Sequence, residues 1–201
     1  MSLLKKFQTI QAPNLCFLHS AKGGLSILAY DYVDHFNGPL EDLEPFVKKH
    51  KDKLLIGYIS YDAALQQHKV QSKHPIDPDV PGVQFLAFEN WHEENSPSAK
   101  PSQTLTGDSL KPQITPEQYS TSFKNIQQHI QQGDVYQVNL THQLYGCTNK
   151  RAQELFVDII KQNPANFAAY LGFNNFELLS ASPERFIKIE QDQITTQPIK
   201  G

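Results

Sequence analysis

The chain of 201 residues contains little of what marks several classes of protein. Its only two cysteines, Cys16 and Cys147, are too few for a disulfide framework and too far apart for a Cys-x-x-Cys metal or redox pair. No apolar run approaches the roughly 18 residues that a membrane-spanning helix needs, and no apolar block follows the N-terminal lysines as it would in a secretory signal. We therefore expect a cytoplasmic protein whose two thiols are core residues in a reducing compartment.

An excess of charge of one sign is also missing. The 18 basic and 21 acidic residues give a formal net charge of -3, and hydrophobic residues make up 39% of the chain and aromatic residues 10%. This composition is typical of a globular protein and excludes a wholly disordered chain. The lack of a basic excess argues against a nucleic-acid partner, and the lack of long apolar runs argues against a membrane partner.

Generic catalytic signatures are absent as well. Gly23-Gly24 lacks the third glycine of a dinucleotide-binding loop, and no Gly-Lys-Ser/Thr is present to bind a phosphate. The segment from His92 to Ser96 begins like a zinc-protease helix, but serine stands where the second histidine ligand would be. None of these patterns assigns an activity.

Residues 1–92 are predicted to be rich in β-strands. The expected strands are Leu15–Leu18, Leu25–Tyr32, Leu54–Tyr61 and Val83–Phe88, which are rich in β-forming residues and separated by Gly, Pro and Asn turn signals. One helix is predicted around Leu40 to His50. Its first residue is left open, because Pro45 would break the interior of a helix but is tolerated in the first turn.

Residues 93–114 differ in composition. Half of the residues from Glu93 to Pro116 are Pro, Ser, Thr or Gly, and few are apolar. Such a segment cannot bury enough apolar surface to offset the entropy lost on ordering. We therefore predict a linker or mobile loop between two regions, 1–92 and 115–201.

The region 115–201 opens with a strong helix signal. Thr115-Pro116-Glu117-Gln118 supplies an N-cap, a proline at the first helical position and a capping-box glutamine, and Gly133 is a natural C-terminal stop. The alternation of apolar and polar residues predicts a half-buried strand from Asp134 to Thr141. A second amphipathic helix is predicted from Ala152 to the residue before Pro164.

The remainder of the chain reads as consecutive strands. They are expected at Phe167–Leu171, Glu177–Ala181, Arg185–Ile189 and Ile194–Ile199. The short connections between them suit antiparallel hairpins rather than parallel crossovers. The predicted fold class is therefore α+β, with antiparallel β-sheets covered by helices.

Several segments, in order along the chain, resemble blocks of the chorismate-utilising enzymes, the family that contains the large subunits of aminodeoxychorismate synthase and anthranilate synthase. These segments are Leu18–Ser20, Gly57–Asp62, Gly133–Thr141, Asn163–Leu171, Ser182–Phe186 and Gln197–Gly201. The resemblance implies the N-terminal half of an anthranilate-synthase-like chorismate-binding fold. It also implies that residues 115–201 are the start of a catalytic region whose remainder is not in this sequence.

One residue discriminates within the family. The block Pro198-Ile199-Lys200-Gly201 resembles the form found in aminodeoxychorismate synthases, whereas anthranilate synthases typically carry alanine where Lys200 stands. The resemblance implies that Lys200 attacks ring carbon 2 of chorismate as the 4-hydroxyl leaves, after which ammonia adds at carbon 4 and expels the lysine. A free lysine has a pKa of about 10.4, so this role requires a lowered pKa. The alternative is an exposed lysine at a strand end.

The resemblance assigns roles to three further residues. Glu184, in the Ser182–Phe186 block, would be the acid that protonates the departing hydroxyl; the alternative is an ordinary glutamate on a solvated hairpin. Some family members bind tryptophan in the N-terminal sheet. The resemblance implies that Ser20 and Pro164 would be among the residues that line such a pocket.

The resemblance also implies a cofactor and partners. Mg²⁺ is expected in the full-length enzyme, with its ligands in the C-terminal half of the protein, which would also hold the chorismate carboxylates. A glutamine amidotransferase subunit would supply the ammonia for a pathway to p-aminobenzoate and folate. We expect these 201 residues alone to be inactive. The alternatives are an anthranilate synthase component I and a non-catalytic scaffold that docks the amidotransferase.

Overall fold

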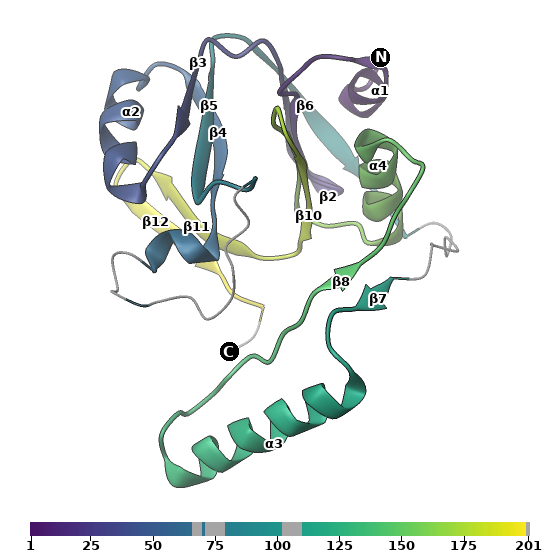
Figure 1. Cartoon of the computed structure of the whole chain (residues 1–201). Helices are drawn as coiled ribbons and strands as arrows, with labels where there is room; N and C mark the ends of the chain where they lie inside the picture. Colours follow the sequence, from purple (N-terminus) through teal and green to yellow (C-terminus); the bar gives the residue numbers. More distant parts are fainter. Residues whose placement is uncertain (66–69, 71–78, 102–109, 200–201) are drawn as a thin grey trace. The chain divides into compact units, whose positions relative to one another are not determined.

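The computed structural model describes residues 1–65, 70, 79–101 and 110–199 (Figure 1). The chain divides into two compact units: Met1–Thr104 together with Arg151–Gly201, and Leu105–Lys150. Among the described residues, the first unit contains most of the sheet structure and all of the buried hydrophobic side chains. The prediction of an α+β fold with antiparallel sheets and helices is confirmed.

A five-stranded antiparallel sheet is the centre of the first unit. Its order is β10-β9-β1-β2-β6, with β1 at Cys16–His19, β2 at Lys22–Ala29, β6 at Trp91–Ser98, β9 at Phe167–Gly172 and β10 at Glu177–Ser182. The short strand β1 pairs with β2 on one side and with β9 on the other, so that Phe17 is opposite both Leu28 and Tyr170. The predicted N-terminal and C-terminal regions therefore share one sheet.

A second antiparallel sheet in this unit has the order β3-β5-β4. Its strands are β3 at Asp34–Asn37, β4 at Leu54–Ile59 and β5 at Val83–Phe88. A 3-10 turn at Leu40–Asp42 precedes helix α2, Leu43–Lys49, whose Phe46 ring lies 5.7 Å from the ring of Phe36 on β3. Pro45 stands in the first turn of α2, which confirms the predicted helix.

Two hydrophobic cores cover the two faces of the five-stranded sheet. On one face, helices α1 (Leu3–Thr9) and α4 (Ala152–Gln162) pack against the sheet (Figure 1). Their aromatic rings contact those of β1 and β9. The ring of Phe7 lies 4.8 Å from Phe17, 5.6 Å from Phe156 and 5.0 Å from Tyr170. Burial of each such side chain stabilises the folded state by about 1.5–3 kcal/mol. Because its members come from α1, β1, α4 and β9, the cluster holds together segments that are distant in sequence.

The second core lies between the two sheets. It contains Cys16 and Ala29 from the five-stranded sheet and Ile56, Leu86 and Phe88 from the three-stranded sheet. Because successive side chains of a strand point to opposite faces, neighbouring residues of β1 serve different cores. Strand β1 thereby connects the helical layer to the second sheet.

The hairpin at the end of the described chain follows the prediction closely. Strand β11, Arg185–Glu190, pairs antiparallel with β12, Gln193–Gln197, and the register shifts between Arg185 and Lys188. The partners at the open end of the hairpin are Arg185 and Gln197. Most of the hairpin's side chains are exposed, including the apolar ones of Phe186 and Ile194.

The second unit is built around helix α3, Pro116–Gln132. The hydroxyl of Thr115 accepts a hydrogen bond from the Gln118 backbone N–H, and the Gln118 side chain accepts one from the Thr115 N–H, which completes the predicted capping box. Gly133 ends the helix with φ at 80°, in the left-handed region that favours glycine. A short pairing of β7, Lys111–Pro112, with β8, Leu144–Tyr145, accompanies the helix.

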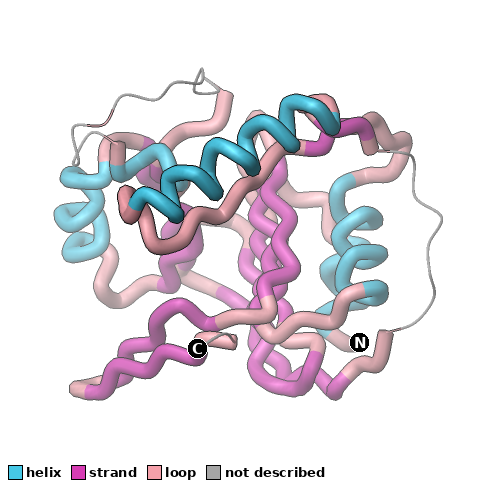
Figure 2. The backbone as a smooth tube through the Cα atoms, turned by 90° about the horizontal axis from the view of Figure 1, so that it is seen from below, coloured by secondary structure: helices cyan, strands magenta, loops and turns pink. Residues whose placement is uncertain are grey.

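Three predictions are wrong. Residues Asp134–Thr141 form no strand and run as a loop after α3 (Figure 2), since among the described residues no strand is available to pair with them. Residues Glu93–Ser98 of the predicted linker belong to β6 instead, because their backbone pairs with β2 at the edge of the sheet. Cys147 is exposed rather than in a core, whereas Cys16 is buried as predicted.

Some of the linker prediction remains open. Residues 102–109 lie outside the described residues, and the boundaries 1–92, 93–114 and 115–201 otherwise stay predictions. The helix α1 and the strand β3 were not predicted at all, since neither has a pronounced periodic pattern.

The contacts of Asp34 generate a pH-dependent prediction. One oxygen, Oδ2, accepts hydrogen bonds from Lys49 Nζ at 2.6 Å and His50 Nε2 at 2.8 Å, and Oδ1 accepts one from the His35 N–H at 2.9 Å. These bonds, first of all the one from Lys49, hold the pKa of Asp34 below its usual value. A folded-state pKa below the unfolded value gives stability that is present above about pH 4 and is lost as the pH falls further.

We expect Asp34→Asn to lower the melting temperature at pH 7 by about 2–4 °C, the change that about 1 kcal/mol makes in a domain of this size. The difference from the unsubstituted protein should shrink between pH 5 and pH 3. Thermal unfolding followed by circular dichroism at several pH values measures it. The control Asp192→Asn, in the turn between β11 and β12, should leave the melting temperature unchanged; a pH-independent effect of Asp34→Asn would contradict the prediction.

Candidate functional site

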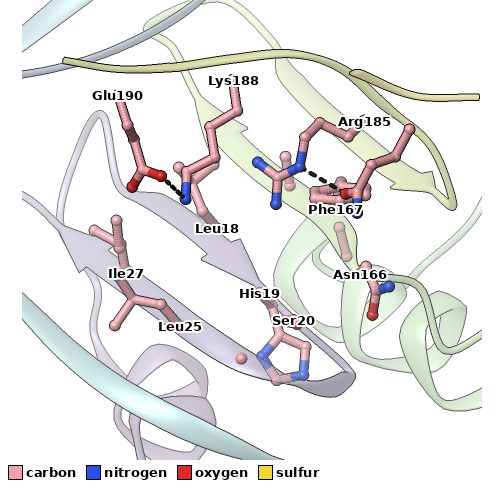
Figure 3. A pocket seen from close by; sticks show the side chains of 14 residues that line it. Leu18, His19, Ser20, Leu25, Ile27, Asn166, Phe167, Arg185, Lys188 and Glu190 are labelled. Atoms are coloured by element: carbon pink, nitrogen blue, oxygen red, sulfur yellow. Dashed lines mark hydrogen bonds and ion pairs between the residues drawn. The ribbon is translucent and has the colours of Figure 1, made fainter. Parts of the chain in front are cut away.

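A cavity of about 500 Å³ in the first unit lies between the five-stranded sheet and the β11–β12 hairpin (Figure 3). The sheet side is apolar and is formed by Leu18, Leu25, Ile27, Phe167 and Ala169. The hairpin side is polar and is formed by Arg185, Lys188, Glu190 and Gln197. A cavity of this size, apolar on one side with a few polar groups on the other, can hold a small organic molecule.

The hairpin brings one uncompensated positive charge to the cavity. The Arg185 Nε donates a hydrogen bond to Gln197 Oε1 at 2.9 Å, and the guanidinium lies 4.7 Å from the centre of the Phe167 ring. Within the described part of the chain, no carboxylate forms an ion pair with Arg185. Lys188, in contrast, is neutralised by Glu190 at 2.7 Å. The cavity therefore suits a ligand with a negative group and an apolar body.

The turn after β1 forms one end of the cavity. The Ser20 hydroxyl donates to the Gly23 carbonyl at 2.9 Å, and the Ser20 N–H donates to Ser26 Oγ at 3.1 Å. Gly24 has φ at +136°, and a Cβ at this position would stand 2.9 Å from Ser20 Oγ. Glycine is thus required here both for the backbone conformation and for the space that Ser20 occupies.

The turn before β9 meets the turn after β1. The Ala21 N–H donates to the Ala165 carbonyl at 2.9 Å, which brings Ser20 and Asn166 to the same cavity. Of the two residues that the sequence suggested for a tryptophan pocket, Ser20 lines the cavity. Pro164 does not line it, although Pro164 is buried in the adjoining turn.

His19 also lines the cavity and was not singled out from the sequence. Its ring stacks on Phe17 at 5.2 Å, and its Nδ1 lies 3.1 Å from Ser26 Oγ. Burial lowers the pKa of His19, and the nearby charge of Glu94 only partly offsets this effect. The imidazole is therefore neutral at pH 7, and Arg185 remains the charge that a ligand would meet.

The predicted acid Glu184 lies outside this cavity. It is exposed in the loop between β10 and β11, where its N–H donates to the Ser182 hydroxyl and that hydroxyl donates to the Glu184 carbonyl. The pairing of Arg185 with Gln197 puts Glu184 at the open end of the hairpin, beside the strand end that leads toward residue 200. The predicted nucleophile Lys200 lies outside the described residues.

The described residues contain neither a candidate metal site nor a candidate membrane span. No group of three or more His, Cys, Asp or Glu side chains is arranged to hold a metal ion there. None of the described helices is both long enough and apolar enough to cross a membrane.

Comparison with known proteins gives the following similarities. A family described as chorismate binding enzyme matches residues 1–201. The aminodeoxychorismate synthase component 1 of Escherichia coli (strain K12) is 36% identical over 111 residues, which cover 55% of this chain and 24% of that protein. The protein of the same name from Salmonella typhimurium is 37% identical over 84 residues, which cover 42% of this chain and 18% of that protein.

The chain is also similar to a protein that is named as an anthranilate synthase. Anthranilate synthase component 1 3 of Haloarcula marismortui is 32% identical over 83 residues, 41% of this chain and 16% of that protein. The matched stretches thus span about a quarter or less of the length of these relatives. Because the family match extends over residues 1–201, the chain belongs to the family of chorismate binding enzymes.

Proposed function

We propose that the chain is part of an aminodeoxychorismate synthase component 1, which converts chorismate and ammonia to 4-amino-4-deoxychorismate for p-aminobenzoate and folate synthesis. Relatives of that name at 33% to 37% identity support the proposal. Lys200 in the Pro-Ile-Lys-Gly block favours it over anthranilate synthase, the alternative to which one of the relatives belongs by name.

The observation that carries the proposal is the register of the β11–β12 hairpin. Glu184 directly precedes Arg185, and Lys200 follows three residues after Gln197, the strand partner of Arg185. In the sequence, the proposed acid therefore directly precedes β11, and the proposed nucleophile comes three residues after the end of β12, the strand paired with β11. Residues attached in this way can serve one substrate, as catalysis by fixed groups requires.

Each group would have a defined role in the reaction. The neutral amine of Lys200 forms a bond to ring carbon 2 while the 4-hydroxyl departs as water, with its extra proton supplied by Glu184. Ammonia then forms a bond at carbon 4, and the bond from Lys200 to carbon 2 breaks. A glutamine amidotransferase subunit would supply the ammonia, and the environment of Lys200 must lower its pKa for the amine to be neutral.

The remaining machinery is proposed to lie in a C-terminal half of the same protein. That half would carry the ligands of Mg²⁺, and the ion would neutralise negative charge on the substrate carboxylates. Without that half, chorismate turnover by these 201 residues would be undetectable. Exposed apolar side chains support a further packing partner. They are Tyr119, Phe123 and Ile130 of α3 and Phe186, Ile189 and Ile194 of the β11–β12 hairpin. A chain that bound the amidotransferase but contributed nothing to turnover would instead be a scaffold.

In the complete protein, we expect Lys200→Ala to reduce 4-amino-4-deoxychorismate formation to near the limit of detection, because the covalent route requires the amine. Product chromatography with chorismate and ammonium measures it. The matched control Lys161→Ala, at the end of α4, should retain full activity. An unchanged rate in Lys200→Ala contradicts the role, and release of anthranilate by the unsubstituted protein would favour the alternative enzyme.

For Glu184, the conservative change Glu184→Gln keeps the shape of the side chain and removes its proton. The kcat should fall by about 10²–10⁴, the usual contribution of a general acid, while KM changes little. Steady-state kinetics with Glu177→Gln on β10 as control tests this. A change confined to KM would show that Glu184 binds substrate or supports the loop.

A second function is favoured by the cavity that Ser20 and Asn166 line. We propose that it binds L-tryptophan, with the indole on the apolar sheet side and the carboxylate at Arg185. Calorimetry should detect binding of L-tryptophan, and binding of tryptamine, which lacks the carboxylate, should be about tenfold weaker. In Arg185→Gln the two ligands should bind alike. No heat of binding for L-tryptophan in the unsubstituted protein would refute this function.

A further inference from the structure

A buried hydroxyl stands behind the wall of the cavity. Ser26 on β2 is fully inaccessible to solvent, and its Oγ contacts three groups: the Ser20 N–H at 3.1 Å, His19 Nδ1 at 3.1 Å and Ser96 Oγ at 2.7 Å. These partners come from the end of β1, the turn that follows it, and the edge strand β6. One oxygen thus links three adjacent parts of the five-stranded sheet.

The position of Ser26 within β2 explains why it is not itself part of the cavity. Its neighbours Leu25 and Ile27 line the cavity, and successive side chains of a strand point to opposite faces. Ser26 therefore points away from the cavity, where its hydroxyl can use its full capacity of two accepted bonds and one donated bond. The Ser20 N–H takes one accepting site, and His19 and Ser96 share the remaining two interactions.

Ser20 and Ala21 form the short connection between β1 and β2, and hydrogen bonds to three other segments hold it. The Ala21 N–H donates to the Ala165 carbonyl at 2.9 Å, and the Ala21 carbonyl accepts from the Ala99 N–H at 2.6 Å. Gly23 and Gly24, which have positive φ, lie within β2. The Ser20 hydroxyl donates to the carbonyl of Gly23, near the start of β2. Ser26 holds Ser20 from outside the turn, on a strand whose conformation is set by its pairing with β1 and β6.

We propose that Ser26 is a positioning residue, whose buried hydroxyl fixes Ser20 at the cavity and thereby sets the affinity of the cavity for its ligand. This inference rests on the proposed binding of L-tryptophan in the cavity. Ser26 touches no ligand itself. It acts through the Ser20 backbone, and Ser20 lines the cavity.

Calorimetry with L-tryptophan tests the inference in three variants. Ser26→Ala should weaken binding about tenfold, the effect typical of losing one well-placed hydrogen bond at a site. Ser26→Thr keeps the hydroxyl and should keep the affinity. The matched control Ser96→Ala removes another hydroxyl of the same cluster but leaves the bond between Ser26 and Ser20, so its affinity should change less than threefold.

A double-mutant cycle separates positioning from a general structural effect. Ser20→Ala lacks the hydroxyl that Ser26 would position, so adding Ser26→Ala to it should weaken binding no further. An equal loss in both backgrounds would overturn the inference, as would an unchanged affinity in Ser26→Ala alone. If Ser26→Ala does not fold, Ser26→Cys, which has a similar size and a weaker hydrogen-bonding group, replaces it in the cycle.

Failure of the ligand proposal would be visible separately. If the unsubstituted protein binds no L-tryptophan, the cavity function is refuted, and hydrogen exchange of the Ser20 amide then decides the role of Ser26. Exchange should be slow in the unsubstituted protein and in Ser96→Ala, and at least tenfold faster in Ser26→Ala. Equal protection of the Ser20 amide in all three proteins would overturn the positioning role.

Discussion

The pairing of β1 with both β2 and β9 is the constraint on which the rest of the first unit depends. Strand β1 has four residues, and its two ladders connect segments that are close in sequence on one side and about 150 residues away on the other. Its side chains serve both cores: Phe17 enters the aromatic cluster beneath α1 and α4, and Cys16 enters the core between the sheets. Burial raises the pKa of the Cys16 thiol to about 12, so this side chain acts as a small apolar group.

The same pairing creates the cavity. One end of the cavity is formed by the turn after β1 and the turn before β9, which meet because these strands are neighbours in the sheet. Strand β10 then leads directly into the β11–β12 hairpin, which supplies Arg185. Since Lys188 is paired with Glu190 and His19 is neutral, the charge of the cavity is that of a single guanidinium. The proposed ligand class follows from this charge and from the apolar sheet side.

The second unit shows how local and long-range interactions differ. Helix α3 has a complete capping box and a glycine stop, so interactions within a few residues define both of its ends. None of its residues is buried, although its apolar side chains recur at helical spacing. The capping interactions define where the helix begins and ends. The apolar side chains along one face of the helix would be buried only against a packing partner. The relatives, which are several times longer than the matched stretch, are consistent with such a partner.

The amino-acid sequence by itself determined those elements whose signals are local. The caps of α3, the end of α4 before Pro164, and the strands of the β11–β12 hairpin all depend on residues within a few positions of one another. The alternation from Asp134 to Thr141 is equally regular, yet it forms no strand. A strand needs a partner for its backbone, and the local pattern contains no information about one.

Tertiary structure alone decided the features that depend on distant partners. The polar residues Glu93–Ser98 form a strand because β2 offers its edge to them, even though their composition is that of a loop. The cavity has the same origin. The family resemblance pointed to Ser20, but the meeting of Ser20 with Asn166 and Arg185, and the support of Ser20 by Ser26, arise from sheet pairing across most of the chain. Hydrogen bonds between distant strands leave no periodic trace in sequence, which is why only the folded chain reveals them.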